Sequence, residues 1–281
     1  MLDKTSLTST ATKTLGNRAK WLNTYIEEAE FFEKVLDSDV SQLPTGSHLV
    51  EIGSGIGLLS LNLASRGFIV TAFEPQASGF NEMHQMRDLV RNNWKGSLPK
   101  INFLDVSINE STRLDSPADY VFAINVIEHV SDYKTLIYNA SKLATSKGVV
   151  RIICPNYAIP YEPHFEIPVI FSKRLTSKIF RRQIEQSEIP NSKEFWQDLS
   201  WPTHRALKRY LESEDLKLEF SRDATNFYIN RALSDSSFVA RKGHIWGILI
   251  KGFAVLAQHL ARFIPITFMP IIDCRITNNT K

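Results

Sequence analysis

Apolar residues follow two different patterns along the first 155 positions of the chain. Short apolar runs without clean alternation are separated by longer stretches in which apolar residues recur every three or four positions. The short runs indicate strands that are buried on both faces, and the periodic stretches indicate helices. The predicted strands are 48–52, 68–73, 101–104, 120–127 and 149–154, and the predicted helices are 18–37, 56–66 and 131–143. This alternation predicts an α/β fold with right-handed crossovers between parallel strands.

Local signals set the ends of several of these elements. Gly67 follows the helix at 56–66 and is typical of a helix C-terminus. Ser131 is the candidate N-cap of the next long helix, with Asp132 in its first turn. The residues before 18 are rich in Ser and Thr and lack the apolar core of a secretory signal, and Asp3 counts against mitochondrial targeting. We therefore expect a disordered N-terminal lead.

The pattern changes after Pro155. Residues 156–200 carry four further prolines, and a segment of this length and composition indicates a functional lid. A helix at 203–212 and a strand at 216–221 are expected to follow, and residues 244–274 are strongly apolar but interrupted by polar side chains. The expected organisation is 1–44 as lead and helix, 45–225 as the main domain and 226–281 as an apolar C-terminal extension.

Composition narrows the class of protein. The chain has 281 residues, of which 43% are hydrophobic and 22% charged, with a formal net charge of +3. These values indicate an ordinary globular protein and give no reason to expect a nucleic-acid partner. Cys154 and Cys274 stand far apart, so neither a disulfide framework nor a structural zinc site is expected, and a reducing, cytoplasmic location fits.

A glycine-rich loop follows the first predicted strand. Glu51, Gly53, Gly55 and Gly57 alternate with other residues where this strand turns into a helix. Glycines at such positions let the backbone turn tightly and approach a ligand, which points to a nucleotide-like cofactor. A nicotinamide fingerprint requires a glycine at position 58, which is leucine here. A carboxylate two residues before the loop suits a cationic ligand group, and this argues against a pyrophosphate.

This loop resembles motif I of the class I S-adenosylmethionine-dependent methyltransferases. The resemblance implies a Rossmann-like seven-stranded, mostly parallel sheet with helices on both faces, extended here by an N-terminal helix, a Pro-rich lid insertion and an apolar C-terminal helical segment. It also implies a cofactor site at the ends of four strands, in which Glu74 holds the ribose hydroxyls, Asp105 and Val106 hold the adenine, and Asn125 lines the methionine end. The cofactor is then S-adenosylmethionine.

Residues 125–130 (NVIEHV) most resemble the small-molecule methyltransferases of the ubiquinone-biosynthesis type. Members with an E-x-x-E-H sequence bind a divalent ion there, but the first acidic position is Asn125 here, so we expect no metal. His129 and His164 are the candidate catalytic bases, because transfer to a hydroxyl benefits from a base. The alternative role for His129, with Glu128, is to order the loop, and His164 could equally be structural.

The resemblance implies methyl transfer to a small-molecule, sugar or lipid-linked acceptor, most often to oxygen. The alternative is a non-catalytic S-adenosylmethionine-binding module. Residues 171–182 carry five basic side chains and no acidic one, so this segment is either a solvated helix or meets a phosphate-bearing acceptor or an anionic lipid surface. Residues 244–274 would lie in the core, in a dimer interface or against a membrane. The sequence does not indicate an oligomeric state.

Overall fold

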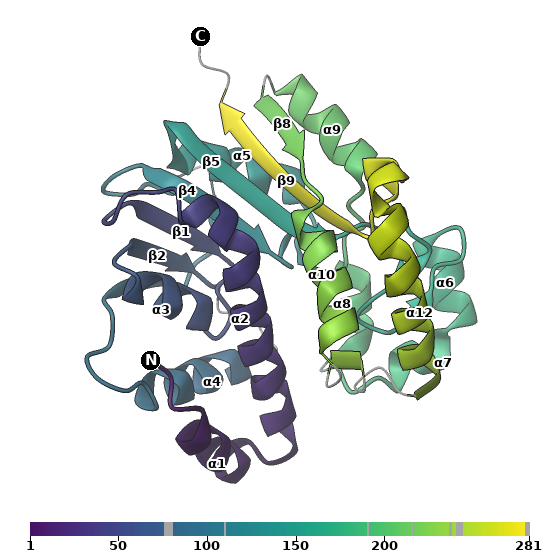
Figure 1. Ribbon diagram of the computed structural model, residues 1–281, viewed down its shortest axis with the longest axis horizontal. Coiled ribbons are helices and arrows are strands. Elements are labelled where there is room, and N and C mark those ends of the chain that lie inside the picture. The colour runs from purple at the N-terminus through teal and green to yellow at the C-terminus, as the bar shows by residue number, and fades with distance from the viewer. Residues whose placement is uncertain are drawn as a thin grey trace. The chain divides into compact units, whose positions relative to one another are not determined.

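A computed structural model describes residues 1–75, 81–109, 111–189, 191–214, 216–235, 238–239 and 244–278. It is an α/β protein whose seven-stranded sheet has the order β3-β2-β1-β4-β5-β9-β8 (Figure 1). These strands are β1 (His48–Ile52), β2 (Ile69–Phe73), β3 (Ile101–Leu104), β4 (Ala118–Ile124), β5 (Ala144–Pro155), β8 (Leu216–Phe220) and β9 (Ile271–Asn278). β1 pairs in parallel with β2 and β4, and β2 pairs in parallel with β3. The predicted fold class is confirmed.

The chain divides into two compact units. The first comprises Met1–Val126, Asp132–Arg151 and Thr277–Lys281, and the second comprises Ile127–Ser131 and Ile152–Ile276. The helices of the first unit are α1 (Lys4–Leu15), η1 (Gly16–Arg18), α2 (Ala19–Val40), α3 (Leu58–Ser65), α4 (Asn81–Asn92) and α5 (Tyr133–Leu143). The strands and helices predicted before residue 155 are all present, within a few residues of their expected ends.

The N-terminal lead is not disordered, contrary to our expectation. It forms α1, in which Leu7, Ala11 and Leu15 recur at helical spacing and are buried. They join a core cluster with side chains of α2, α3 and α4, and the Asp3 carboxylate accepts a hydrogen bond from the Ser6 amide at the start of the helix. Burial of this apolar stripe outweighs the weak helix propensity of the surrounding Ser and Thr residues.

One predicted cap is wrong by a single position. The N-cap of α5 is Asp132 rather than Ser131, and its Oδ1 accepts a hydrogen bond from the Thr135 amide at 3.1 Å. Its Oδ2 also accepts a hydrogen bond from the Thr135 hydroxyl at 2.7 Å. A carboxylate at this position both satisfies a free amide and interacts favourably with the positive end of the helix.

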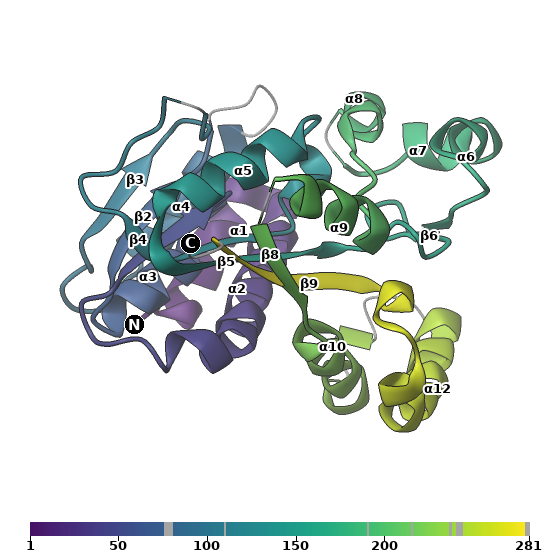
Figure 2. The same ribbon diagram turned by 90° about the horizontal axis from the view of Figure 1, so that it is seen from above.

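The second unit holds most of the residues that the sequence left without a clear pattern. Its elements besides β8 are η2 (Ile127–His129), β6 (Tyr161–Glu162), β7 (Ile167–Pro168), α6 (Lys173–Ile179), α7 (Arg181–Glu185), α8 (Ser192–Asp198), α9 (His204–Ser213), α10 (Asp223–Ser234), α12 (His244–Leu260), η3 (Ala261–Phe263) and η4 (Ile266–Phe268). Within this unit, α6 to α8 lie on one side of β9, and α10 and α12 lie on the other (Figure 2). The apolar tail thus supplies a helix and the sheet strand β9, and the sequence analysis did not predict this strand. Among the described residues, none of the helices is long and apolar enough to cross a membrane.

Candidate cofactor and catalytic site

The glycine loop joins β1 to α3 in the first unit. Gly53, Gly55 and Gly57 have φ angles of 73°, 51° and 71°, in the left-handed region that side chains rarely adopt. A Cβ atom on Gly53 would lie 2.3 Å from Val126 Cγ2, and one on Gly57 would lie 2.8 Å from the Phe103 ring. A side chain at either position would therefore be strained and would require Val126 or Phe103 to move. A Cβ atom on Gly55 would lie 3.8 Å from Met83, so the loop is open around Gly55.

Glu51 lies within β1, two residues before the loop, and is buried. Its carboxyl group accepts a hydrogen bond from the Ser60 hydroxyl of α3. Burial and, to a smaller extent, the nearby Glu74 raise the pKa of Glu51 to about 8 against the opposing effect of the Ser60 hydrogen bond. The carboxyl group is therefore mostly protonated at pH 7, and it becomes the stronger acceptor for a cationic group as the pH rises.

Glu74 follows β2 and reaches the same loop. Its Oε2 accepts a hydrogen bond from the Gly55 amide at 2.7 Å. Burial raises the pKa of Glu74, while the Gly55 hydrogen bond and the positive charge of Arg87 lower it. This contact brings the carboxyl end of β2 to the loop that follows β1, as the parallel pairing of the two strands requires.

Asp105 follows β3 and pairs with Arg87 of α4. The Arg87 Nη1 atom donates to Asp105 Oδ1 at 3.1 Å, and the guanidinium lies 5.2 Å from the centre of the Phe103 ring. The Arg87 side chain is 6% exposed, whereas that of Asp105 is 43% exposed and Val106 lies at the surface beside it. Arg87 was not among the predicted site residues. Its spacing within an amphipathic helix gives no sign that it contacts a strand end.

Asn125 directly follows β4 with a φ of 53°, a left-handed conformation that asparagine tolerates better than most residues. The next residue, Val126, is the one that a side chain at Gly53 would strike. The residues predicted for the cofactor thus lie at the carboxyl ends of β1, β2, β3 and β4, with Glu51 inside β1 and the others after their strands. β1 and β4 are neighbours in the sheet although not in sequence, which is where open α/β sheets bind ligands.

These residues suit S-adenosylmethionine. The loop is open at Gly55, so a ligand can approach the backbone there, whereas the Val126 and Phe103 side chains fill the space beside Gly53 and Gly57. Carboxylates at Glu74 and Asp105 offer acceptors for hydroxyl and amino groups, and Glu51 offers a third carboxyl group for a cation. The loop itself carries no basic side chain, which is consistent with a cofactor that lacks a pyrophosphate group.

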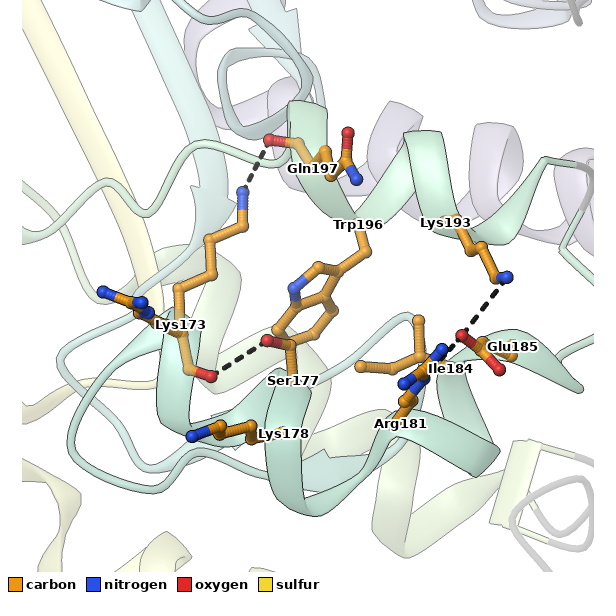
Figure 3. A pocket seen from close by; sticks show the side chains of 10 residues that line it. Lys173, Ser177, Lys178, Arg181, Ile184, Glu185, Lys193, Trp196 and Gln197 are labelled. Carbon is orange, nitrogen blue, oxygen red and sulfur yellow. Dashed lines mark hydrogen bonds and ion pairs between the residues drawn. The ribbon is translucent and has the colours of Figure 1, made fainter.

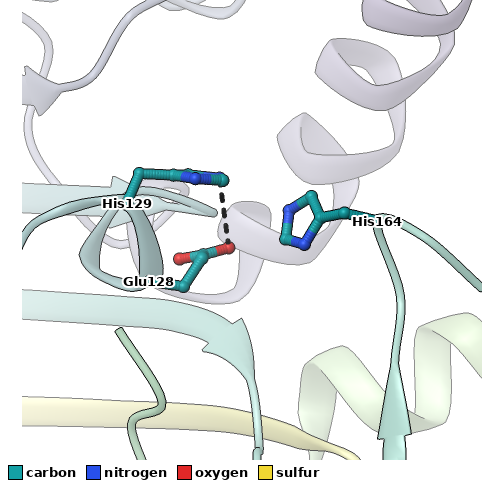
Figure 4. A group of neighbouring side chains, drawn as sticks. All are labelled: Glu128, His129 and His164. Atoms are coloured by element: carbon teal, nitrogen blue, oxygen red, sulfur yellow. Dashed lines mark ion pairs between the residues drawn. The ribbon is translucent and has the colours of Figure 1, made fainter. Parts of the chain in front are cut away.

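A second cluster, in the second unit, contains both predicted catalytic histidines (Figure 4). Glu128 and His129 lie on η2, and His164 lies between β6 and β7. The ring centres of the two histidines are 4.9 Å apart, and the ring of Phe195 on α8 lies 5.1 Å from His129 and 5.3 Å from His164. The sequence placed these histidines 35 positions apart, and the structure brings them into contact.

Glu162 orients His164 and was missed by the sequence analysis. This side chain is fully buried, and its Oε1 lies 2.7 Å from His164 Nδ1. It also accepts hydrogen bonds from the Phe165 amide at 2.7 Å and the Tyr157 hydroxyl at 3.2 Å. With Nδ1–H donating to this carboxylate, the neutral His164 ring carries its lone pair on Nε2. The E-x-H spacing was a visible signal, but nothing in the sequence indicated that Glu162 is buried.

His129 is held in the neutral form. Burial and, to a smaller extent, the nearby His164 lower its pKa to about 3. Its Nε2 lies 4.0 Å from Glu128 Oε1, and Glu128 is itself fully buried. A neutral imidazole beside His164 can accept or donate a hydrogen bond without adding a second positive charge to the cluster.

This second cluster also has the ligand types that can hold a metal ion, on Glu128, His129 and His164. One ligand atom from each lies within 4.8 Å of the others. Imidazole and carboxylate ligands suit several divalent metals. The contact between His164 Nδ1 and Glu162 leaves Nε2 as the nitrogen that such an ion would use.

Comparison with known proteins identifies the family. The family model described as "Methyltransferase domain" matches residues 26–221, which include every candidate cofactor residue and both histidines. The chain belongs to this methyltransferase family. The resemblance to class I S-adenosylmethionine-dependent methyltransferases is thereby confirmed, together with the enzyme class.

Two relatives match this methyltransferase over different shares of its length. It is 34% identical over 253 residues to an uncharacterized protein of Mycobacterium tuberculosis (strain ATCC 25618 / H37Rv), covering 89% of this chain and 85% of the relative. It is also 34% identical over 127 residues to the ubiquinone biosynthesis O-methyltransferase of Rickettsia conorii, covering 44% of this chain and 38% of the relative.

The fold is also found in a solved methyltransferase. The plantazolicin methyltransferase BpumL, in a complex with S-adenosylhomocysteine (SAH) and a triazolic desmethylPZN analog, superposes with a TM-score of 0.51 at 11% identity. The superposition covers 98% of this chain and 96% of that chain. At this identity, the likeness is one of fold.

Proposed function

We propose that this methyltransferase transfers a methyl group from S-adenosylmethionine to a hydroxyl oxygen of a small-molecule, sugar or lipid-linked acceptor. The observation that carries this proposal is the 2.7 Å contact between His164 and the buried Glu162. A histidine held in this way can accept the proton of a hydroxyl group, and a hydroxyl is the acceptor that most needs such a base. The similarity to a ubiquinone biosynthesis O-methyltransferase also supports oxygen as the acceptor atom.

The first unit holds the cofactor in this proposal. The backbone at Gly53, Gly55 and Gly57 lies against it, Glu51 faces its cationic end, and Glu74 accepts hydrogen bonds from the ribose hydroxyls. Asp105 and Val106 hold the adenine, and Asn125 lines the methionine end. When bound, S-adenosylmethionine supplies a methyl group on a positively charged sulfur, which a nucleophile can attack directly. The S-adenosylhomocysteine in the complex of the structural neighbour supports this cofactor.

The second unit supplies the base. His164 Nε2 accepts the hydroxyl proton of the acceptor, and the Glu162 carboxylate stabilises the imidazolium that forms. His129 remains neutral and lies beside His164, where it can hydrogen-bond to the acceptor. No covalent enzyme intermediate is needed, so the remaining contribution of the protein is to place the acceptor oxygen in line with the methyl group.

Calorimetry tests the cofactor half of the proposal. We expect S-adenosylmethionine and its demethylated product to bind and NADH not to bind. Gly55→Val should abolish binding, because a branched side chain would cover the open part of the loop. Gly46→Val is the matched control, since Gly46 also has a positive φ, of 86°, and nothing lies within 4 Å of the Cβ position. Binding of NADH alone, or equal affinity in Gly55→Val and Gly46→Val, would contradict the proposal.

Mass spectrometry tests the acceptor half. Metabolites and lipids from a lysate are incubated with the enzyme and S-adenosylmethionine carrying an isotope-labelled methyl group. The proposal predicts one or a few labelled products with the enzyme and none without it. Cofactor binding with no labelled product from any extract would instead favour the non-catalytic binding module.

We further propose a cytoplasmic enzyme that contacts a membrane through its tail. Of the two segments considered from the sequence, 171–182 and 244–274, the second exposes the larger apolar set, namely Val255, Leu256, Leu260, Phe263 and Phe268. Within the second unit, α6 and α12 lie on opposite sides of β9, so a flat surface would meet only one of them (Figure 2). Liposome flotation should fall when Phe263 and Phe268 are both changed to serine, and equal flotation of variant and wild type would exclude this contact.

A further inference from the structure

A cavity of about 700 Å³ lies among the three short helices α6, α7 and α8 of the second unit (Figure 3). Its volume is in the range that small-molecule sites occupy. None of the candidate cofactor or catalytic residues lines it. The residues that line it are Lys173, Arg174, Ser177, Lys178, Arg181, Ile184, Glu185, Lys193, Trp196 and Gln197.

The lining of this cavity has a large excess of positive charge. It contains five basic side chains and one carboxylate, Glu185. That carboxylate is already engaged, since Arg181 Nε lies 2.9 Å and Lys193 Nζ 3.2 Å from its Oε1, and hydrogen bonds from both cations lower its pKa. Glu185 therefore holds two cations in place at the wall and leaves the lining with a net positive charge.

The other three cations have no such carboxylate partner in their hydrogen bonds. Lys173 Nζ donates to the carbonyl oxygens of Gln197 at 2.8 Å and Leu199 at 2.6 Å, which fix the ammonium group without neutralising it. Among the residues that the structure describes, no carboxylate lies within ion-pair distance of Arg174 or Lys178. Arg and Lys together offer a fork of guanidinium donors and a mobile ammonium, the combination that binds phosphate groups well.

The inner wall of the cavity is apolar. Trp196 and Ile184 are 5% and 4% exposed and belong to a core cluster with Ile167 and Leu199. Figure 3 shows the Trp196 indole between the side chains of α6 and those of α7. Only the edges of these two side chains reach the cavity, and the aliphatic stems of the surrounding Lys and Arg side chains extend the apolar wall, so an ester can place its organic part there while its anionic group meets the cations.

We propose that this cavity binds a phosphate or diphosphate ester. Arg174, Lys178 and Lys173 contact the anionic group, and the organic part lies along the aliphatic stems of these side chains and the exposed edge of Trp196. The proposal rests on the second unit alone and does not depend on methyl transfer. α8 gives the site a connection to the histidines, because Phe195 packs against His129 and His164 while the next residue, Trp196, lines the cavity. An acceptor that carries a phosphate would have a point of attachment in the same unit as the base.

Titration calorimetry of the full chain, with no cofactor added, tests the proposal. The probes are phenyl phosphate, pyrophosphate and inorganic phosphate. We expect saturable binding of phenyl phosphate, tighter than that of inorganic phosphate, and weaker at high salt. The double variant Arg174→Gln/Lys178→Gln should weaken phenyl phosphate binding by about tenfold or more, because two charge-assisted contacts are lost.

The control is Arg205→Gln/Lys217→Gln, which removes the same two side-chain types from exposed positions of the same unit outside the cavity. It should bind phenyl phosphate like the wild type. Thermal melting of both double variants shows that they are folded. Absence of saturable phenyl phosphate binding, or the same loss in both double variants, would overturn the proposal.

Vesicles distinguish two sources of the phosphate group. Phosphatidylcholine vesicles with and without phosphatidic acid are tested for binding by flotation. Binding to phosphatidic acid vesicles that is lost in Arg174→Gln/Lys178→Gln identifies a lipid headgroup as the ligand. Phenyl phosphate binding with equal flotation on vesicles with and without phosphatidic acid identifies a soluble phosphate ester. Both results support a phosphate site in the cavity, and neither depends on whether the enzyme transfers a methyl group.

Discussion

His164 Nδ1 lies 2.7 Å from Oε1 of Glu162, a carboxylate that is fully buried. This pair determines which ring nitrogen of His164 is free to act on an acceptor. The Phe165 amide and the Tyr157 hydroxyl hold the carboxylate from other directions, so its orientation is fixed before an acceptor arrives. Such preorganisation is what a general base requires.

Glu162→Gln should lower kcat by about 10²- to 10⁴-fold, because the amide can donate to Nδ1 and so place the proton of the ring on Nε2, where it blocks base catalysis. Steady-state kinetics and calorimetry check this prediction. The dissociation constant of S-adenosylmethionine should not change. His259→Asn, at an exposed position on α12, is the control and should leave kcat unchanged. An unchanged kcat in Glu162→Gln would show that His164 is not the base.

Gly53→Ala should weaken cofactor binding by about tenfold or more and destabilise the fold by about 1–3 kcal/mol, because the new Cβ would lie 2.3 Å from Val126 Cγ2. Calorimetry and urea unfolding measure the two effects. Gly96→Ala is the control, since Gly96 has a φ of 79° with nothing within 4 Å of the Cβ position. It should lose about 1 kcal/mol of stability through backbone strain and none of the cofactor affinity.

Adding a second substitution, at Val126, separates the effect of the close contact with Val126 from that of backbone strain at residue 53. In Gly53→Ala/Val126→Ala, the nearest remaining atom of residue 126 is Cβ, which lies 3.4 Å from the Cβ position of residue 53. We expect this double variant to recover part of the affinity that Gly53→Ala loses. If it binds the cofactor no better than Gly53→Ala, the close approach to Val126 is not the reason for the glycine.

The unfolding free energy should depend on pH through Glu51. Its pKa is about 8 in the folded protein and near its ordinary value of 4.5 in the unfolded chain, so the folded state holds a proton that the unfolded state releases between these values. The stabilising contribution is fully present below pH 4.5 and is lost as the pH rises toward 8. The slope is on the order of 1 kcal/mol per pH unit.

Glu51→Gln should remove this dependence, because glutamine resembles the protonated form. Urea unfolding at several pH values between 5 and 8 should therefore show the variant gaining stability relative to the wild type as the pH rises. Glu214→Gln, at an exposed position, should follow the wild type. A constant difference between Glu51→Gln and the wild type across this range would mean that the pKa of Glu51 is not raised.

Chelation tests the expectation that no metal takes part. Asn125 replaces the first acidic residue of the E-x-x-E-H sequence, although Glu128, His129 and His164 still place three ligand atoms within 4.8 Å of one another. We expect methyl transfer to be unchanged after dialysis against EDTA and unaffected by added Mg²⁺ or Zn²⁺. Loss of activity with EDTA that Mg²⁺ restores would show instead that this cluster is a metal site.

The placement of the proposed cofactor residues could be predicted because it is encoded locally. Each polar residue directly follows an apolar strand, and parallel strands bring their carboxyl ends to one edge of the sheet. The places of Gly53, Glu74, Asp105 and Asn125 at strand ends follow from strand assignment, and the roles proposed for them follow from the resemblance to the methyltransferase family. No knowledge of side-chain contacts was required.

The residues that the sequence did not reveal act through distant contacts. Arg87 reaches Asp105 from a helix, and Glu162 is recognisable only once its burial is known. Arg151 is fully buried and donates to Asp39 at 2.9 Å across 112 positions, although arginine is normally a surface residue. Such pairings depend on tertiary packing, which single-sequence patterns do not contain.

The atom to which the transferred carbon becomes bonded shows most directly whether the acceptor is a hydroxyl oxygen. Full-length enzyme is incubated with its acceptor and S-adenosylmethionine carrying a ¹³C-labelled methyl group, and the product is examined by ¹³C NMR. We expect a resonance in the methoxy range, which disappears when Glu162→Gln replaces the wild type. A label bonded to nitrogen or carbon, or full transfer by the Glu162→Gln variant, would contradict this expectation.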